Sequence, residues 1–226
     1  MKNHMSRLFY EAAKCPFIRT AFTLLELLIV ISIIAILAAM LLPSLKSARD
    51  SAKKIVCAGR LKEIGAASTM YTNDYDGFMV YGQHSVLRLY SYVNAKENDK
   101  RGFFVCPTDP SPMLQNLANL DGANRVFYYT YRQNGQIAYP EGLSLPTRRW
   151  RISEFRHSST CFNFMPSNAS SIIYSYKGSA NKPGLPAAVY WHKNGININH
   201  VDGHVAYYKF REPQCDQLKY WTPDAP

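Results

Sequence analysis

The sequence predicts an α+β fold, in which one long N-terminal helix packs on an antiparallel β-sheet. The helix is predicted by an almost continuous apolar run at 22–42 and by the 3.6-residue apolar period that follows it. The sheet is predicted by short runs of β-branched and aromatic residues that Gly, Pro and Asn separate. The chain has 226 residues, of which 47% are hydrophobic, and is therefore long and apolar enough to form a packed core.

The apolar run is long enough to cross a membrane. Between Phe22 and Leu42 the polar side chains are those of Thr23, Glu26 and Ser32. A helix of this length rises about 31 Å, which matches a hydrocarbon core about 30 Å thick. We therefore expect residues 22–45 to form the transmembrane half of the helix.

The charges that flank the run predict its orientation. The first 21 residues carry four basic side chains and one acidic one, which favours a cytoplasmic N-terminus and an extracytoplasmic domain. A second basic cluster between residues 46 and 62 weakens this argument. An ordinary secretory signal is the alternative, but Leu37 and Ala39 make a poor small-x-small cleavage site.

The helical pattern continues beyond the apolar run. Apolar and small residues recur at spacings of 3 and 4 at Leu45, Ala48, Ala52 and Val56, and again at Cys57, Leu61, Ile64, Ser68 and Tyr71. This period predicts an exposed amphipathic half of the same helix over 46–76, with a kink at Pro43. Asn73, Asp74 and Asp76 precede Gly77 and favour a helix-ending turn over a calcium loop, because no bidentate acid follows.

The start of the apolar run resembles a known processing signal. Arg19, Thr20 and Ala21, followed by Phe-Thr-Leu-Leu-Glu at 22–26, are similar to the signal of type IV prepilins and type II secretion pseudopilins. The resemblance implies a pilin-like fold, a leader at 1–21, cleavage between Ala21 and Phe22 by a prepilin peptidase, and methylation of the new amine. The usual residue before the cut is Gly, so Ala21 is a departure.

Glu26 is a carboxylate in a run that otherwise suits lipid. A charge at the bilayer centre costs about 2.5–3.5 kcal/mol on insertion scales. The resemblance implies a partner for it: in a filament, Glu26 would neutralise the Phe22 amine of a neighbouring subunit. A Glu side chain that reaches the interface without a partner is the alternative.

Later segments resemble the same family. The stretches at 55–65 and 70–77, the Phe-Val-Cys-Pro at 104–107, and His192 followed after nine residues by Asp202-Gly203 are similar to a large pilin-like group abundant in planctomycetes. Residues 111–190 carry no resemblance that we can name.

Residues 77–226 are expected to form one β-rich domain. Strands are expected at 78–81, 103–106, 126–131, 160–165, 171–176, 188–191, 196–201 and 204–210. Asp202-Gly203 lies between the last two runs and predicts a hairpin with a type I′ turn. Proline-bearing stretches near 107–112, 140–146 and 183–186 are expected as loops.

The expected cleavage of the leader would remove Cys15 and leave four cysteines. Cys57, Cys106, Cys161 and Cys215 permit two disulfides in an extracytoplasmic domain, with three pairings open. One of them, Cys57 with Cys106, would tie the helix to the first strands and leave Cys161 with Cys215. No CxxC spacing occurs, which argues against a zinc ribbon.

A cluster near the C-terminus contains residue types that bind metals. His192, His200, Asp202 and His204 could offer nitrogen and oxygen ligands to zinc. Ligand types without geometry are weak evidence, and an Asp-Gly turn with histidines on a solvated hairpin is favoured instead. We expect no bound metal and no cofactor.

Catalysis and nucleic-acid binding have little support in the sequence. No Gly-x-Ser-x-Gly, phosphate loop or His-Glu-x-x-His occurs, so we do not expect an enzyme. The formal charge is +10, of which the leader carries +3. The basic run Arg148, Arg149, Trp150 and Arg151 is typical of single-strand binders, but a solvated basic loop is the commoner cause, and nucleic acid is not an expected partner.

Two functions from different classes remain. The first is a structural subunit, a pilin or pseudopilin, of a type IV pilus or type II secretion-like filament. The second is a membrane-tethered binding module, for example for carbohydrate, that uses the same signal as an anchor. The expected partners are the prepilin peptidase/methyltransferase, other pilin-like subunits and inner-membrane lipid. The expected location is the inner membrane, with one span and the C-terminal domain in the periplasm or outside.

Overall fold

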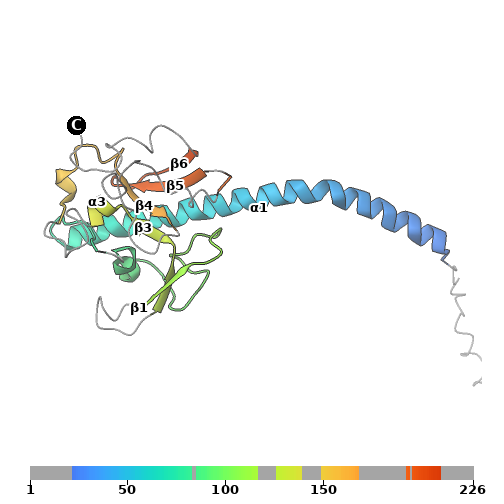
Figure 1. Ribbon diagram of the computed structural model, residues 1–226, viewed down its shortest axis with the longest axis horizontal. Coiled ribbons are helices and arrows are strands. Elements are labelled where there is room, and N and C mark those ends of the chain that lie inside the picture. Colours follow the sequence, from blue (N-terminus) through green and yellow to red (C-terminus); the bar gives the residue numbers. More distant parts are fainter. Residues whose placement is uncertain are drawn as a thin grey trace, which may run out of the picture. The chain divides into compact units, whose positions relative to one another are not determined.

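The computed structural model describes residues 22–82, 85–116, 126–138, 149–167, 192–193 and 195–209. One long helix, α1 (Leu24–Asp74), is followed by short helices and antiparallel strands (Figure 1). The chain divides into two compact units, Met1–Lys46 and Ser47–Pro226, and α1 belongs to both. The predicted α+β class, with a long N-terminal helix and an antiparallel sheet, is confirmed.

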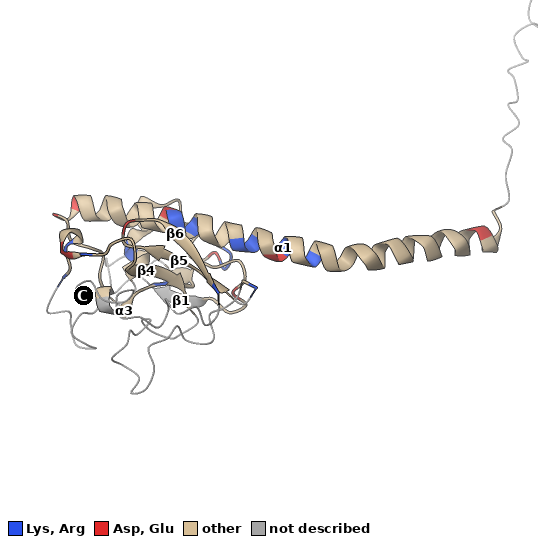
Figure 2. Ribbon diagram, turned by 90° about the horizontal axis from the view of Figure 1, so that it is seen from above, with Lys and Arg blue, Asp and Glu red and all other residues tan. Residues whose placement is uncertain are grey.

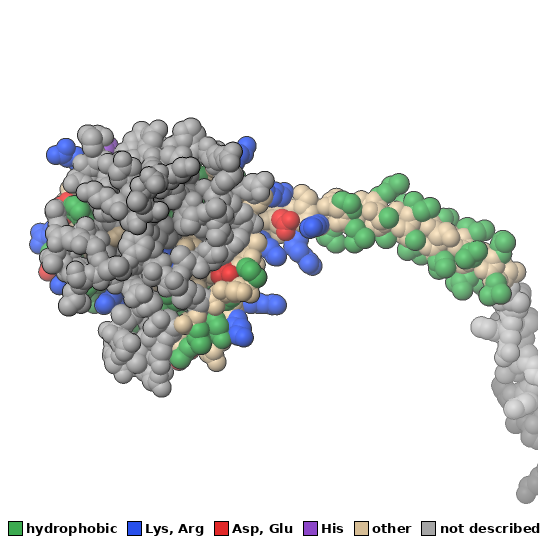
Figure 3. All heavy atoms as spheres, viewed as in Figure 1, with side chains coloured by type: hydrophobic (Ala, Val, Ile, Leu, Met, Phe, Trp, Pro, Cys, Tyr) green, Lys and Arg blue, Asp and Glu red, His purple; other side chains and the backbone are tan. Residues whose placement is uncertain are grey.

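The first half of α1 is apolar and exposed. Among the described residues, α1 is the one helix long and apolar enough to span a membrane. Every residue from 22 to 49 is exposed, and apolar side chains cover this half of the helix (Figure 3). Pro43 lies inside the helix, where its missing N–H leaves the Ala39 carbonyl without its usual backbone partner.

The second half of α1 supplies the core of the globular unit. The predicted stripe of Cys57, Leu61, Ile64, Ser68 and Tyr71 is buried throughout. A buried Leu or Ile side chain contributes about 1.5–3 kcal/mol to stability, so this face of the helix is a major source of folding energy. The preceding stripe of Leu45, Ala48, Ala52 and Val56 is exposed and takes no part in this core.

The helix ends in the turn that the sequence predicts. Asp76 and Gly77 have φ values of 52° and 81°, in the left-handed region. The Gly77 N–H donates to the Thr72 carbonyl at 2.8 Å, which closes the helix in a Schellman-like motif. The Asp74 carboxylate accepts a hydrogen bond from the Tyr92 hydroxyl at 2.7 Å, so it serves a structural contact.

The main sheet is antiparallel, in the order β3-β4-β5-β6. Its strands are β3 (Tyr131–Gln133), β4 (Phe162–Pro166), β5 (Gly195–His200) and β6 (Val205–Lys209). A second sheet pairs β1 (Met113–Asn116) with β2 (Val126–Tyr129). The expected strand at 126–131 is therefore two strands that break at Thr130, whose N–H donates to the Phe104 carbonyl at 2.8 Å.

The β5–β6 hairpin is confirmed, but its turn type is not the predicted one. Gly203 has a φ of 89°, whereas Asp202 is not among the positive-φ residues. The Gly203 N–H donates to the His200 carbonyl at 2.9 Å, and the His200 N–H donates to the His204 carbonyl at 2.9 Å. This is a type I turn followed by a left-handed glycine, the usual three-residue hairpin loop.

Two expected strands are wrong. In 103–106 the Val105 N–H donates to the Gly102 carbonyl at 3.1 Å, so the segment turns instead of pairing in a sheet. Its apolar residues fill the core from a loop, which a strand-like composition does not distinguish. In 78–81, Phe78 forms an isolated bridge to Arg151. The runs at 171–176 and 188–191 lie outside the described residues.

Three short helices complete the described elements. They are the 3-10 helices η1 (Ser85–Tyr92) and η2 (Ile152–Glu154) and the helix α3 (Gly135–Ala138). Of these, η1 buries Val86, Leu87 and Leu89 in the core that the second half of α1 lines. A separate buried cluster contains Met79, Ile137, Trp150, Phe155, Cys161 and Val201.

Candidate functional site

The start of α1 forms a reciprocal capping box. The Thr23 N–H and hydroxyl both donate to Glu26 Oε2, at 2.9 and 2.8 Å. The Glu26 N–H donates in return to Thr23 Oγ1 at 3.2 Å. Each side chain satisfies a backbone donor of the first helical turn, which fixes where the helix begins. Ala21 lies outside the described residues, and Phe22 is exposed.

Glu26 stands on an apolar surface. The neighbouring Leu24, Leu25, Leu27, Leu28 and Ile31 are exposed on the first turns and line a shallow, open hollow. A continuous exposed apolar surface of this size marks contact with lipid or with another apolar surface. Glu26 is thus an exposed carboxylate beside an apolar surface, and burial of that surface against another would strengthen any ion pair that Glu26 makes.

Basic side chains follow the apolar half along α1 (Figure 2). One of these residues, Lys54, contacts the sheet: its Nζ lies 3.7 Å from the Tyr207 ring centroid, and its carbonyl accepts from Asn197 Nδ2 at 2.8 Å. Lys193 Nζ donates to the hydroxyls of Ser47 and Ser51, at 3.1 and 2.8 Å. These contacts attach the sheet to the helix where the globular unit begins.

Gly65 allows the sheet to approach the helix closely. A Cβ on Gly65 would lie 2.4 Å from Asn199 Nδ2, closer than real Cβ atoms come. The same Nδ2 donates to the carbonyls of Gly203 and His204, at 3.1 and 3.4 Å. Gly65 therefore makes room for the side chain that holds the hairpin loop closed.

Two of the cysteines meet His192 in the interior. Sγ of Cys57, Sγ of Cys106 and a ring nitrogen of His192 all lie within 4.8 Å of one another. Cys57 and Cys106 are fully buried, and His192 is 2% exposed. His192 Nε2 lies 3.2 Å from the Cys106 sulfur, while Nδ1 lies 3.2 Å from the Thr108 hydroxyl. We call these three residues the Cys-His cluster.

The surroundings of the Cys-His cluster shift the pKa values of its thiols. The hydrogen bond from the Cys106 thiol, more than His192, lowers the pKa of Cys57 well below its usual value and outweighs burial. The same hydrogen bond and burial raise the pKa of Cys106. Burial, followed by the nearby Cys57 and Cys106 charges, raises the pKa of Tyr131.

The disulfide pairing stays a prediction. Cys57, Cys106 and Cys161 are free thiols in the structure, and Cys215 lies outside the described residues. Cys161 is buried in the second cluster, where burial raises its pKa to about 12. The structure does bring the helix cysteine and the loop cysteine together, as one of the predicted pairings requires.

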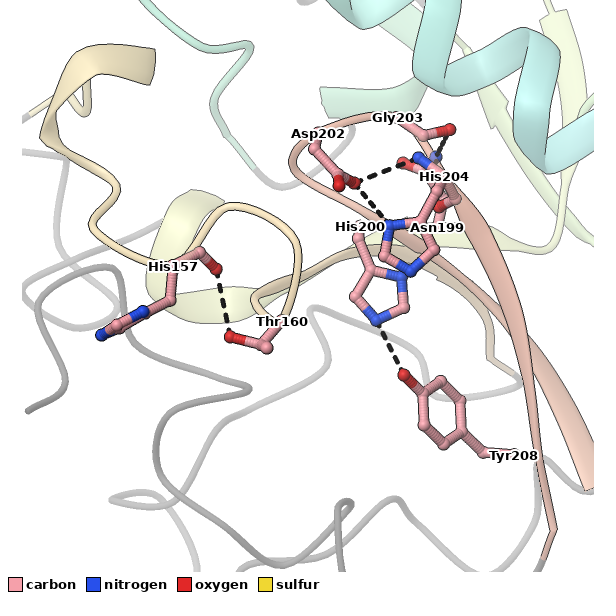
Figure 4. Close-up of polar contacts among 8 residues, drawn as sticks. All are labelled: His157, Thr160, Asn199, His200, Asp202, Gly203, His204 and Tyr208. Atoms are coloured by element: carbon pink, nitrogen blue, oxygen red, sulfur yellow. Dashed lines mark hydrogen bonds and ion pairs between the residues drawn. The ribbon is translucent and has the colours of Figure 1, made fainter.

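The structure separates the histidines that the sequence groups near the C-terminus. His192 lies before the first residue of β5, and His200 is its last residue. The strand is about 16 Å long at 3.3 Å per residue, so it separates the two histidines. His204 and His200 stack with ring centroids 3.9 Å apart, and Asp202 Oδ1 lies 2.6 Å from His204 Nδ1 (Figure 4). His200 Nε2 lies 2.9 Å from the Tyr208 hydroxyl. Stacked rings do not direct their nitrogens at one point, so the four residues form no common site.

The basic run at 148–151 packs its aromatic side chain inward. Trp150 is 8% exposed and contacts Phe155, which leaves no indole face for a nucleic-acid base. The Arg149 and Arg151 guanidinium groups lie 5.6 and 4.5 Å from the Phe78 ring centroid. Arg148 lies outside the described residues.

Comparisons with known proteins find one family model and two relatives. The family model described as the prokaryotic N-terminal methylation motif matches residues 19–42. The chain is similar to the type II secretion system core protein G of Pseudomonas aeruginosa, with 43% identity over 56 residues, and to the type IV wide pilus major component PilA4 of Thermus thermophilus, with 47% identity over 57 residues.

These matches cover a part of each protein. Each spans 25% of this chain, and they span 39% and 44% of the two relatives. No solved structure matches the chain. The family model places the methylation motif across the start of α1, which makes this segment prepilin-like.

Proposed function

Because its N-terminal segment is prepilin-like, we propose that the chain is a structural subunit, a pilin or pseudopilin, of an envelope filament. The single observation that carries the proposal is the N-terminal methylation motif at 19–42, which coincides with the capped, exposed and apolar start of α1. One relative is named as a secretion-system protein and the other as a pilus component. The proposal accordingly covers both a type IV pilus and a type II secretion-like filament.

Maturation would create the partner that Glu26 needs. Cleavage between Ala21 and Phe22 produces a positive amine on Phe22, and methylation leaves it positive. In the isolated chain both hydrogen bonds to the Glu26 carboxylate go to Oε2, and Oε1 accepts no hydrogen bond from the described residues. Oε1 can therefore accept the amine of a neighbouring subunit while the capping box stays intact.

Assembly would also cover the apolar half of α1. In the membrane this half contacts lipid, and in a filament the corresponding halves of other subunits would replace the lipid. The ion pair between Glu26 and a neighbour's Phe22 would then lie in an apolar bundle, where charge attraction is much stronger than in water. An unpaired subunit would carry both charges into that bundle at a cost of several kcal/mol.

The proposed location follows from the same motif. A leader that is cleaved on the cytoplasmic side places the N-terminus in the cytoplasm, the residues 22–45 in the inner membrane and the rest outside. The structure supports this division, because the residues from 22 to 49 are exposed and the core begins at Cys57. The proposal includes no enzymatic activity.

Photocrosslinking in intact cells tests the proposal. A photoreactive residue in place of Leu28, which is 60% exposed on the apolar half, should give ladders of crosslinked subunits. The same variant in cells that lack the prepilin peptidase is the control, since the uncleaved chain keeps its anchor but has no free Phe22 amine. Monomers alone in both strains would contradict the filament and would favour a tethered module.

A further inference from the structure

The Cys-His cluster has the composition of a metal site. It is the one group of three or more His, Cys, Asp or Glu side chains among the described residues whose ligand atoms converge within 4.8 Å. We propose that Cys57, Cys106 and His192 bind one thiophilic metal ion, with Zn²⁺ as the ion that their two sulfurs and one imidazole suit best. Thiolate and imidazole ligands select zinc over the oxygen-binding cations.

The orientation of His192 supports this assignment. Its Nδ1 faces the Thr108 hydroxyl at 3.2 Å, and its Nε2 faces the Cys106 sulfur at 3.2 Å. A metal-binding histidine uses one ring nitrogen for the ion and the other for a hydrogen bond that fixes its tautomer and direction. Thr108 fills this second position. A disulfide between the two cysteines would not require an imidazole beside it.

The Tyr131 hydroxyl is a further buried polar atom near the Cys-His cluster. The Tyr131 hydroxyl is fully buried and makes no hydrogen bond within ordinary limits among the described residues. It lies close enough to interact with the Cys57 thiol. Structural zinc has four ligands, so the Cys-His cluster leaves one position, for which the buried Tyr131 hydroxyl or a water molecule is the candidate.

The backbone around the cluster is held independently of any ion. The Arg60 guanidinium, one turn from Cys57, donates to the carbonyls of Val105 and Arg101, which brings the Cys106 loop onto α1. His192 exchanges backbone hydrogen bonds with Gly195 at 3.0 and 3.1 Å, and its carbonyl accepts from the Tyr207 hydroxyl at 2.5 Å. The ligands therefore come from three well-fixed segments.

Binding would convert the two thiols to thiolates. The ion takes the two sulfur electron pairs and the lone pair of His192 Nε2, and two protons pass to solvent, so no oxidant or reductant is needed. Because the ligands are buried, the ion would enter as the chain folds, and its binding energy would add to folding stability. The ion would link α1, the loop at 103–109 and the turn at His192 that precedes β5.

Metal analysis of the mature full-length chain in detergent micelles tests the proposal. Protein purified without reductant or chelator should hold about one zinc per chain, and Cys57→Ser and Cys106→Ser should each lose it. Co²⁺ in its place should give thiolate-to-metal charge-transfer absorption that weakens in either variant. Cys161→Ser removes a buried thiol outside the cluster, so it is the matched control and should keep the metal and the absorption.

Thr108→Val keeps the shape of the side chain and removes the hydroxyl that orients His192. We expect it to lower zinc affinity about 10–100-fold, the range seen for such supporting residues. Wild-type protein that neither contains zinc nor takes up Zn²⁺ or Co²⁺ when refolded in reductant would overturn the proposal. A Cys57–Cys106 disulfide in protein whose thiols were trapped by acid directly in cells would also overturn the proposal. These measurements leave the filament proposal unaffected, because they do not depend on assembly.

Discussion

Thr23 and Glu26 bind each other in both directions: the Thr23 N–H and hydroxyl donate to one carboxylate oxygen of Glu26, and the Glu26 N–H donates to the Thr23 hydroxyl. The carboxylate that would pair with a neighbouring subunit is thus already oriented by its own chain. Capping and the proposed pairing are separable, because only the pairing needs a charge on Glu26.

Substitution of Glu26 separates these roles. Glu26→Val should insert into the membrane as well as wild type or better, since a costly charge leaves the apolar run, but it should fail to assemble. Glu26→Gln is the matched control for capping, because an amide in this position can still form the capping box. It should also fail to assemble if the charge is what matters. The measurement is the yield of sheared filaments relative to total membrane-bound protein.

Thr23→Ala completes the comparison. It keeps the charge of Glu26 and removes the hydroxyl of the cap, at a cost of about 0.5–2 kcal/mol in helix stability. We expect reduced but measurable assembly. Normal filament yield from Glu26→Gln or Glu26→Val would show that the carboxylate has no pairing role.

The processing site makes its own prediction. N-terminal sequencing and mass analysis of membrane-extracted protein should find a chain that begins at Phe22 and carries a methyl group on its amine. We expect this product because the methylation motif at 19–42 includes the junction between Ala21 and Phe22. Cells without the prepilin peptidase are the control and should retain residues 1–21. A chain that begins at Met40 would instead establish an ordinary secretory signal.

Gly65 and Gly59 form a matched pair on α1. A Cβ at Gly65 would collide with the Asn199 amide, so Gly65→Ala should displace Asn199 and destabilise the globular unit by about 1–3 kcal/mol. At Gly59 nothing lies within 4 Å of a new Cβ, so Gly59→Ala should stabilise the helix by about 1 kcal/mol. Denaturant unfolding measures both. Equal effects of the two substitutions would refute the close contact between Gly65 and Asn199.

His200 should make stability depend on pH. Burial, followed by the neighbouring His204, lowers the pKa of His200 from 6.5 to about 4, although Asp202 acts in the opposite direction. The unfolded chain therefore binds a proton at a higher pH than the folded chain does. The contribution of neutral His200 to the free energy of unfolding is fully present above pH 6.5. It is lost as the pH falls towards 4, by up to about 3 kcal/mol.

The measurement is the free energy of unfolding between pH 4 and pH 7. His200→Gln should flatten this part of the profile, because no imidazole remains to be protonated. His157→Gln changes an exposed histidine and should leave the profile as in wild type. An unchanged slope in His200→Gln would assign the acid sensitivity to other groups.

Local patterns in the sequence predicted the helix well and the loops poorly. The stripe from Cys57 to Tyr71 is buried as predicted, because its period describes a single face of a single element. The segment 103–106 has the composition of a strand, yet it turns, because its apolar side chains reach the core from a loop. Composition reports burial in both cases and does not report which backbone hydrogen bonds form.

The Cys-His cluster shows the same limit. The sequence singled out all three of its residues but placed them in two groups, cysteines for disulfides and histidines for a hairpin site. Cys57, Cys106 and His192 meet only through the pairing of distant segments around α1, which spacing along the chain does not encode. The one local signal was that both cysteines lie within apolar segments.

Because α1 is one helix from Leu24 to Asp74, a force applied to its apolar end would reach the buried residues through the helix backbone itself. The hydrogen bonds from Lys193 to Ser47 and Ser51 would bear load first, and the packed face at Leu61 and Ile64 would bear it next. A force along the axis shears these contacts together, whereas a force on an edge strand would peel its hydrogen bonds one at a time. A chain pulled by the N-terminal end of α1 would thus resist through many packed contacts at once.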